Sequence, residues 1–133
     1  MSIKINISVG ELLDKITILE IKQERIDDVV KLENVKKELV VLRRQWESSS
    51  YAAISLDEKL GALKKANESL WDIEDKIRIK ESKQEFDAEF IELARSVYFI
   101  NDKRAEVKRL INGKTKSELV EEKSYCDYSS NNP

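Results

Sequence analysis

The chain has 133 residues, of which 38% are charged, and its net charge is only −2. A chain of this length is expected to form one domain with its own core. Its charges of both signs are interleaved, and a pI of about 5.4 argues against binding to a phosphate backbone. One cysteine and no histidine exclude an intramolecular disulfide, a zinc site with the usual ligands, and Ser–His or Cys–His catalysis.

The same composition limits which cofactors the protein can bind and where in the cell we expect it. Only hard cations held by carboxylates remain possible, and we predict no cofactor. The first ten residues lack an apolar signal region, and the longest apolar run, 39–42, is too short to span a bilayer. We therefore expect a cytoplasmic protein that binds neither membranes nor nucleic acid. Abundant Lys, Ile and Asn suggest an AT-rich bacterial or phage genome.

The first predicted helix spans residues 8–27 and begins with a capping box, in which Ser8 is followed three residues later by Glu11. It follows a short alternating stretch, 2–7, that has strand spacing but no evident partner strand. The main apolar face of the helix comprises Val9, Leu12, Leu13, Ile16, Leu19 and Ile26. Ile18 and Ile21 lie on the opposite side, which is typical of a helix that is central in its bundle or covered by a second subunit.

Three further helices are predicted at 31–46, 55–83 and 87–112. The first of these has a purely apolar seam, and a serine-rich loop follows it. Ser55 and Glu58 form a second capping box. Asp87 is a good N-cap and Gly113 a good residue to end the last helix, so 55–83 and 87–112 should form a long antiparallel hairpin. Thr115–Glu118 predicts one more short helix, carrying Leu119 and Val120.

Polar residues interrupt the apolar seams of this hairpin, and these intrusions are the most informative feature of the sequence. If the hairpin folds about residue 84, positions 67 and 101 face each other. The first long helix adds two more polar residues on its main face. The candidate binding residues, between the first helix and the two hairpin helices, are Glu20, Gln23, Asn67, Glu74, Asn101, Arg104 and Lys108.

Two interpretations of this polar seam are open. It can be a register device, because a slipped helix pairing would leave buried amides without partners. It can also be a pocket for a small anionic ligand, in which Arg104 and Lys108 supply the positive charge. An enzyme without histidine would need Glu74 or Glu20 for acid–base chemistry. Carboxylate pairs such as Glu11–Asp14 resemble magnesium-binding pairs, but a chain so rich in acidic residues produces them by chance.

Four stretches together resemble a family of small bacterial and phage proteins of unknown function. They are GELLDKITILEIK, LWDIEDKIRIKE, LARSVYFINDKRAEVKR and SELVEEKSY, beginning at residues 10, 70, 93 and 117. The resemblance implies that they form a single unit, and that Leu119, Val120 and Tyr125 dock on the bundle. It implies no catalytic or binding residue.

The sequence therefore predicts an all-α antiparallel bundle of about four main helices, with a short helix near the C-terminus. Residues 1–125 form the predicted domain and 126–133 a disordered tail. We expect a non-catalytic interaction or assembly module. Homodimerisation would use apolar residues outside the main seams, namely Ile18, Ile21, Phe99 and Leu110. The alternative is a small-anion binding protein or a small helical enzyme.

Overall fold

The computed structural model describes residues 1–128 and confirms the predicted all-α fold. Four α-helices make up this part of the chain: α1 (Val9–Arg25), α2 (Val29–Glu47), α3 (Asp57–Ser82) and α4 (Ala88–Thr115). A single 3-10 turn, η1 (Ser50–Ala53), lies in the predicted serine-rich loop. No strand occurs within the described residues, so the alternating stretch 2–7 is unpaired.

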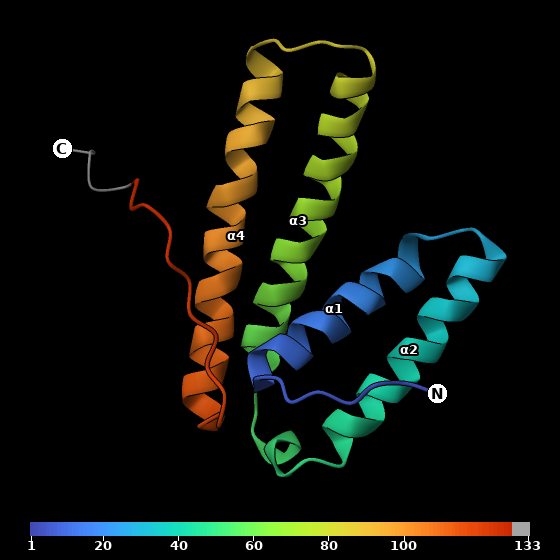
Figure 1. The fold of residues 1–133 in the computed structure, drawn as a ribbon, viewed down its shortest axis with the longest axis vertical. Coiled ribbons are helices and arrows are strands. Elements are labelled where there is room, and N and C mark those ends of the chain that lie inside the picture. The colour runs from blue at the N-terminus through green and yellow to red at the C-terminus, as the bar shows by residue number, and fades with distance from the viewer. Residues whose placement is uncertain (129–133) are drawn as a thin grey trace.

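The helices are arranged as two hairpins of unequal length. α1 and α2 form the shorter one, and α3 and α4 form the predicted long one (Figure 1). α1 packs across the base of the long hairpin, whose tip projects well beyond it (Figure 1). The C-terminal segment turns back after α4 and runs along its outer side (Figure 1). No helix in the described chain is both long enough and apolar enough to cross a membrane.

The hydrophobic core lies where α1 meets the other three helices. Leu13 of α1, Leu39 of α2, Leu63 of α3 and Ile111 of α4 are all fully buried there. Each of these helices contributes residues at three- and four-residue spacing, which brings one stripe per helix onto the shared core. The core therefore belongs to the base of the molecule.

Two predicted N-caps are confirmed and one is wrong. The Ser8 side chain accepts a hydrogen bond from the Glu11 amide, and Asp87 does the same for Phe90. At the start of α3, however, the N-cap residue is Leu56, which makes no side-chain cap. The reason is that Leu56 is buried in the core, and its burial places the chain so that Ser55 lies outside the helix.

The predicted end of α4 and the short helix after it are both wrong. α4 continues through Gly113 to Thr115, because Ile111, Asn112 and Thr115 are all buried there. Lys116, with φ of 54°, then takes the left-handed conformation that we predicted for Gly113.

From residue 117 to 128 the chain is not helical. Leu119, Val120 and Tyr125 are exposed, so they do not dock on the bundle as the resemblance implied. Tyr128 is hydrogen-bonded to Asp102 of α4, which places the first part of the predicted tail against that helix. Residues 129–133 of that tail lie outside the described residues.

Candidate functional site

The polar site is centred on Asp14, a carboxylate on the face of α1 that meets the long hairpin. Its side chain is 1% exposed. It accepts hydrogen bonds from Asn67 Nδ2 of α3 at 2.9 Å and from Arg104 Nε of α4 at 2.9 Å. A second guanidinium nitrogen, Nη2 of Arg104, binds the other carboxylate oxygen. One buried carboxylate thus joins three helices.

Arg104 is held from both sides. Besides the two-pronged pairing with Asp14, its Nη1 donates to Asn101 Oδ1 at 3.3 Å. The hydrogen bond with Asp14 raises the pKa of Arg104, against the lowering effect of burial, and the charges of Asp14 and Glu11 add to the rise. A forked pairing of this kind is stronger and more directional than a single charged contact.

Lys108, one turn further along α4, is 7% exposed and is surrounded by carboxylates. Its Nζ lies 2.7 Å from Glu11, 3.0 Å from Glu121 and 3.9 Å from Asp14. Burial lowers the pKa of Lys108, but the hydrogen bonds to Glu11 and Glu121 outweigh it, and the net shift is upward. Burial likewise raises the pKa of Glu11, but the Lys108 hydrogen bond and the charges of Lys108 and Lys15 bring it below its ordinary value.

The N-terminus of α1 is part of the same site. The Gly10 amide donates to Asn112 Oδ1 at 2.7 Å, and the Val9 amide donates to Ser117 Oγ at 3.1 Å. With the Ser8 cap on the Glu11 amide, the first three amides of the helix all have side-chain acceptors. These donors are therefore not available for an external anion, although helix N-termini commonly bind one.

Gly10 makes the close approach of α1 to α4 possible. A Cβ atom at this position would lie 2.7 Å from the backbone oxygen of Lys108 and 3.0 Å from Asn112 Oδ1. Both distances are below van der Waals contact, and the nearer atom belongs to a helix backbone that cannot rotate away. The absence of a side chain thus brings the two helices near enough for Asp14 to reach Arg104.

The site is internally satisfied. Every buried side-chain nitrogen and oxygen in the described chain has a hydrogen-bond partner. Residues 1–128 contain no group of three or more histidine, cysteine or acidic side chains arranged to hold a metal ion. Chemically, the arrangement holds charges in fixed positions and presents no unpaired buried donor, acid or base.

The structure brings four of the predicted residues together and separates three. Asn67, Asn101, Arg104 and Lys108 all lie in the network, but the two amides are linked through Asp14 and Arg104. Of the remaining three predicted residues, Glu74 lines a crevice beside Asn67 and Arg104 but pairs with Arg78, and Glu20 and Gln23 lie elsewhere.

Each of the three separated residues has a simple explanation. Glu20 pairs with Arg43 of α2 at 3.1 Å, and Glu74 pairs with Arg78 on the same helix at 3.1 Å. Gln23 is exposed near the end of α1.

The centre of the network was missed from the sequence. Asp14 and Thr17, whose hydroxyl accepts from Asn67 at 3.1 Å, were not among the predicted residues, and neither were Glu11, Asn112 and Glu121. The sequence does contain a signal for Asp14 and Thr17. Together with Gly10 and Ile21 they recur at intervals of three and four residues, which places them on one face of a helix. Ile21, which we expected in a dimer surface, is 1% exposed because this second face of α1 packs on the hairpin. α1 is therefore central in its bundle, the first of the two alternatives that its two apolar sides allowed.

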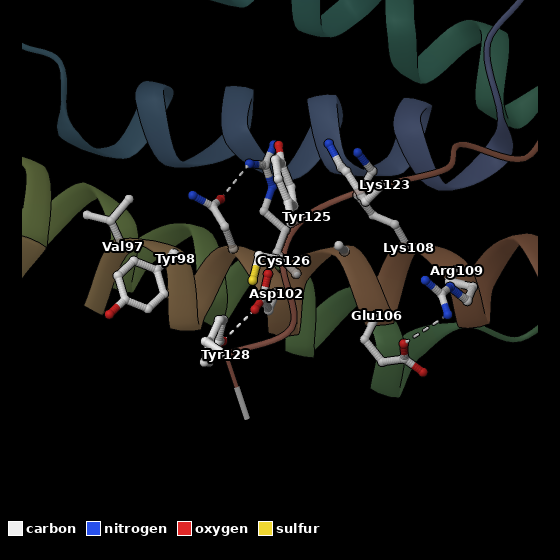
Figure 2. A pocket seen from close by; sticks show the side chains of 13 residues that line it. Val97, Tyr98, Asp102, Glu106, Lys108, Arg109, Lys123, Tyr125, Cys126 and Tyr128 are labelled. Atoms are coloured by element: carbon white, nitrogen blue, oxygen red, sulfur yellow. Dashed lines mark hydrogen bonds and ion pairs between the residues drawn. The ribbon is translucent and has the colours of Figure 1, made fainter. Parts of the chain in front are cut away.

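A groove of about 790 Å³ lies beside the network, between α4 and the C-terminal segment. Figure 2 shows Lys108 pointing from α4 toward α1, with Lys123 of the C-terminal segment close by. Asp102 and Tyr128 meet farther from α1, and the Tyr128 ring packs edge-on against Tyr98 and Phe99. Lys108 lines this groove and pairs with Glu121 at 3.0 Å, so the Glu121 carboxylate takes a position beside Lys108 that a bound anion would take.

Comparison with curated proteins and with solved structures gave no match. A family model does match, and it covers residues 3–133, nearly the whole chain. On that extent of agreement, the chain belongs to the family described as a family of unknown function, DUF6165.

Proposed function

We propose that the protein is a non-catalytic helical interaction module, and that its buried charged network fixes the register of α1 against the long hairpin. The observation that carries this proposal is the complete internal pairing of the network. Arg104 and Lys108 have carboxylate partners within the chain, and the amides of Asn67 and Gly10 are also paired. A slip of α1 by one turn would leave a buried carboxylate and two cations without partners, which costs several kcal/mol.

The groove beside α4 supports a second candidate function, the binding of a small anion. Lys123 is half-exposed at the groove, and Glu121 lies 3.0 Å from Lys108. An anion that displaced Glu121 would contact both lysines. The network favours the first proposal, because Glu11 still neutralises Lys108 after such a displacement.

Thermal unfolding in the presence of anions separates the two functions. For the interaction module, phosphate and citrate should raise the melting temperatures of the wild type and of Lys123→Gln equally, because their exclusion from protein surfaces stabilises any folded chain. For an anion site, phosphate should raise the melting temperature of the wild type further, and Lys123→Gln should abolish this additional rise. Lys123 suits this purpose because its ion pair with Glu121 is 3.8 Å long and lies at the surface, so the loss of this pair leaves the contacts of Asp14 and Arg104 intact.

A paired replacement tests the register role directly. Asp14→Leu combined with Arg104→Met removes the charges together and fills the same space with apolar groups. Such replacements of buried ion pairs are often neutral or stabilising, whereas loss of one partner is costly. We expect the double variant to stay helical but to show broadened backbone NMR signals for α1, which would indicate several registers. A double variant with sharp signals in the wild-type pattern would argue against a register role.

A further inference from the structure

The structure shows what covers the outer side of α4, namely the chain's own C-terminal segment, residues 117–128. After α4 ends, the chain turns back and runs along this helix (Figure 1). Glu121 pairs with Lys108 at 3.0 Å, and Tyr128 donates a hydrogen bond to Asp102. Later residues of the segment thus contact earlier residues of α4, so the two run antiparallel.

The start of the segment is fixed to the base of the molecule. The Ser117 amide donates to the backbone oxygen of Asn112 at 2.9 Å, and the Ser117 hydroxyl oxygen accepts from the Val9 amide at 3.1 Å. The preceding residue, Lys116, takes the left-handed conformation at which the chain reverses. These contacts direct the segment back along α4 without help from its later residues.

Tyr128 holds the far end of the segment through its ring and its hydroxyl group. The centre of its ring lies 5.2 Å from that of Tyr98 and 5.1 Å from that of Phe99. The hydrogen bond to Asp102 raises the pKa of Tyr128 to about 12, so the phenol remains a donor at neutral pH. Tyr98, Phe99 and Asp102 lie within one turn of α4 and on one side of it. Figure 2 shows Tyr128 beside Asp102, away from α1.

Between these two contacts the segment is only loosely held. Residues 118–128 are all exposed, and a groove of about 790 Å³ separates the segment from α4. Lys108 and Asp102 are about 9 Å apart along the helix axis, at about 1.5 Å per residue, whereas residues 121–128 can span up to about 23 Å. A segment with so few buried contacts opens far more easily than the bundle unfolds.

Detachment of the segment leaves the base of the molecule paired. Lys108 loses Glu121 but keeps Glu11 at 2.7 Å. On α4, detachment uncovers two aromatic rings that are already partly exposed, since Tyr98 is 42% and Phe99 38% exposed with the segment in place. The uncovered face thus offers a cation and an apolar aromatic surface within one stretch of helix.

We propose that residues 117–128 form an autoinhibitory strap, which occupies the face of α4 where the protein binds an extended segment of a partner protein that carries a carboxylate and, about seven residues later, a tyrosine. This inference rests on the proposed interaction function and deepens it by naming the surface and the chemistry of the partner. The strap itself shows which side chains this face accepts, because Glu121 and Tyr128 supply one carboxylate and one phenol at that spacing.

A free anion matches only part of this face. It replaces the Glu121 carboxylate but leaves the rings of Tyr98 and Phe99 uncovered. A partner segment supplies both contacts, and the first contact to form holds the second near its place. The strap competes in the same way, because its attachment to α4 gives it a high local concentration. Partner binding is therefore weak while the strap is closed and tighter once it opens.

NMR titration of the full chain with a synthetic peptide of residues 117–128 tests the strap. The peptide carries the change Cys126→Ser, which prevents disulfide formation. A tethered segment has an effective concentration in the millimolar range, so a closed strap implies a dissociation constant below about that value for the free peptide. Titration to about 5 mM therefore detects binding wherever the face is open.

A matched pair of double variants separates release of the strap from other changes in it. Glu121→Gln with Tyr128→Ala removes both contacts of the strap with α4. Glu118→Gln with Tyr125→Ala changes the same residue types at exposed positions of the same segment. We expect the peptide to bind the first variant with a dissociation constant at least tenfold lower than that for the wild type, and the second to equal the wild type.

Replacements on α4 test the face itself. Adding Phe99→Ala and Asp102→Ala to the strap-released variant should raise the dissociation constant at least tenfold, and both positions are exposed, so the fold is kept. A peptide that carries Tyr128→Ala should bind at least tenfold more weakly than the original peptide, because it lacks the ring and the donor.

Three results would overturn this inference: no binding to the strap-released variant at about 5 mM, equal binding to this variant and the wild type, or binding indifferent to the changes on α4. A wild-type dimer that exchanges its C-terminal segments would also overturn it, because the strap would then not close on its own chain. These outcomes are separate from failure of the proposed function. A phosphate-specific thermal rise that depends on Lys123 would contradict the function, whereas a peptide that does not bind would remove only this surface and this partner chemistry.

Discussion

The three glycines of the chain provide a sharp test of the close contact between α1 and α4, because the same substitution should have opposite effects. All three lie within helices. A Cβ atom at Gly10 would meet the Lys108 backbone oxygen at 2.7 Å, whereas a Cβ at Gly61 or Gly113 would meet nothing within 4 Å. Gly10→Ala should therefore destabilise the protein, and the other two substitutions should stabilise it.

The magnitudes follow from two opposing effects. Alanine in a helix is favoured over glycine by about 0.5–1 kcal/mol, which Gly61→Ala and Gly113→Ala should gain. At Gly10 the helices must separate by several tenths of an ångström, and forced overpacking of this kind costs about 1–3 kcal/mol. The separation also lengthens the Asp14–Arg104 contacts. We expect a net loss of about 1–2 kcal/mol for Gly10→Ala, so it should differ from the controls by about 2–3 kcal/mol.

Urea unfolding followed by far-ultraviolet circular dichroism measures this difference. For a chain of this length, a difference of about 2–3 kcal/mol in unfolding free energy corresponds to a difference of roughly 6–15 °C in melting temperature. Equal stability of Gly10→Ala and Gly61→Ala would refute the argument, because it would mean that α1 and α4 are not in close contact at this position.

Further predictions concern the charges of the network. Asp14→Ala removes the carboxylate partner of the partly buried Arg104 guanidinium and one of the two acceptors of Asn67, and should cost about 3–5 kcal/mol in urea unfolding. Asp72→Ala, which breaks only the exposed pair with Arg25, should cost less than about 1 kcal/mol, and equal losses would contradict a structural role for Asp14. Because the folded pKa of Glu11 lies below its ordinary value of 4.5, its contribution is complete above that pH and is lost as pH falls through the folded pKa. Glu11→Gln should accordingly weaken the fall of the unfolding free energy below about pH 4.5. If the unfolding free energy falls with pH as steeply in this variant as in the wild type, Glu11 is not the cause of the fall. At alkaline pH, the raised pKa of Lys108 means that its contribution to the unfolding free energy is complete below pH 10.5 and is lost as pH rises through the folded pKa. Lys108→Met should remove this alkaline loss of stability.

The sequence by itself determined the helices and their pairing. Apolar stripes at three- and four-residue spacing, scarce glycine and proline, and the caps at Ser8 and Asp87 are local signals, because each depends on neighbours within a few residues. They were sufficient for four helices and for the long hairpin. Asn67, Asn101, Arg104 and Lys108 were recognisable for the same reason, since each interrupts an otherwise apolar stripe.

Only the tertiary structure decided what these polar residues contact. Asp14 shares helical spacing with Gly10, Thr17 and Ile21, but this spacing does not say which helices cover that face, and only contact with α3 and α4 makes Asp14 the centre of the network. Long-range burial also overrode local signals at two helix ends. Leu56 displaced the Ser55 cap because its side chain enters the core, and α4 passed Gly113 because Thr115 is buried. Burial depends on residues distant in sequence, and a pattern read along one helix does not contain that information.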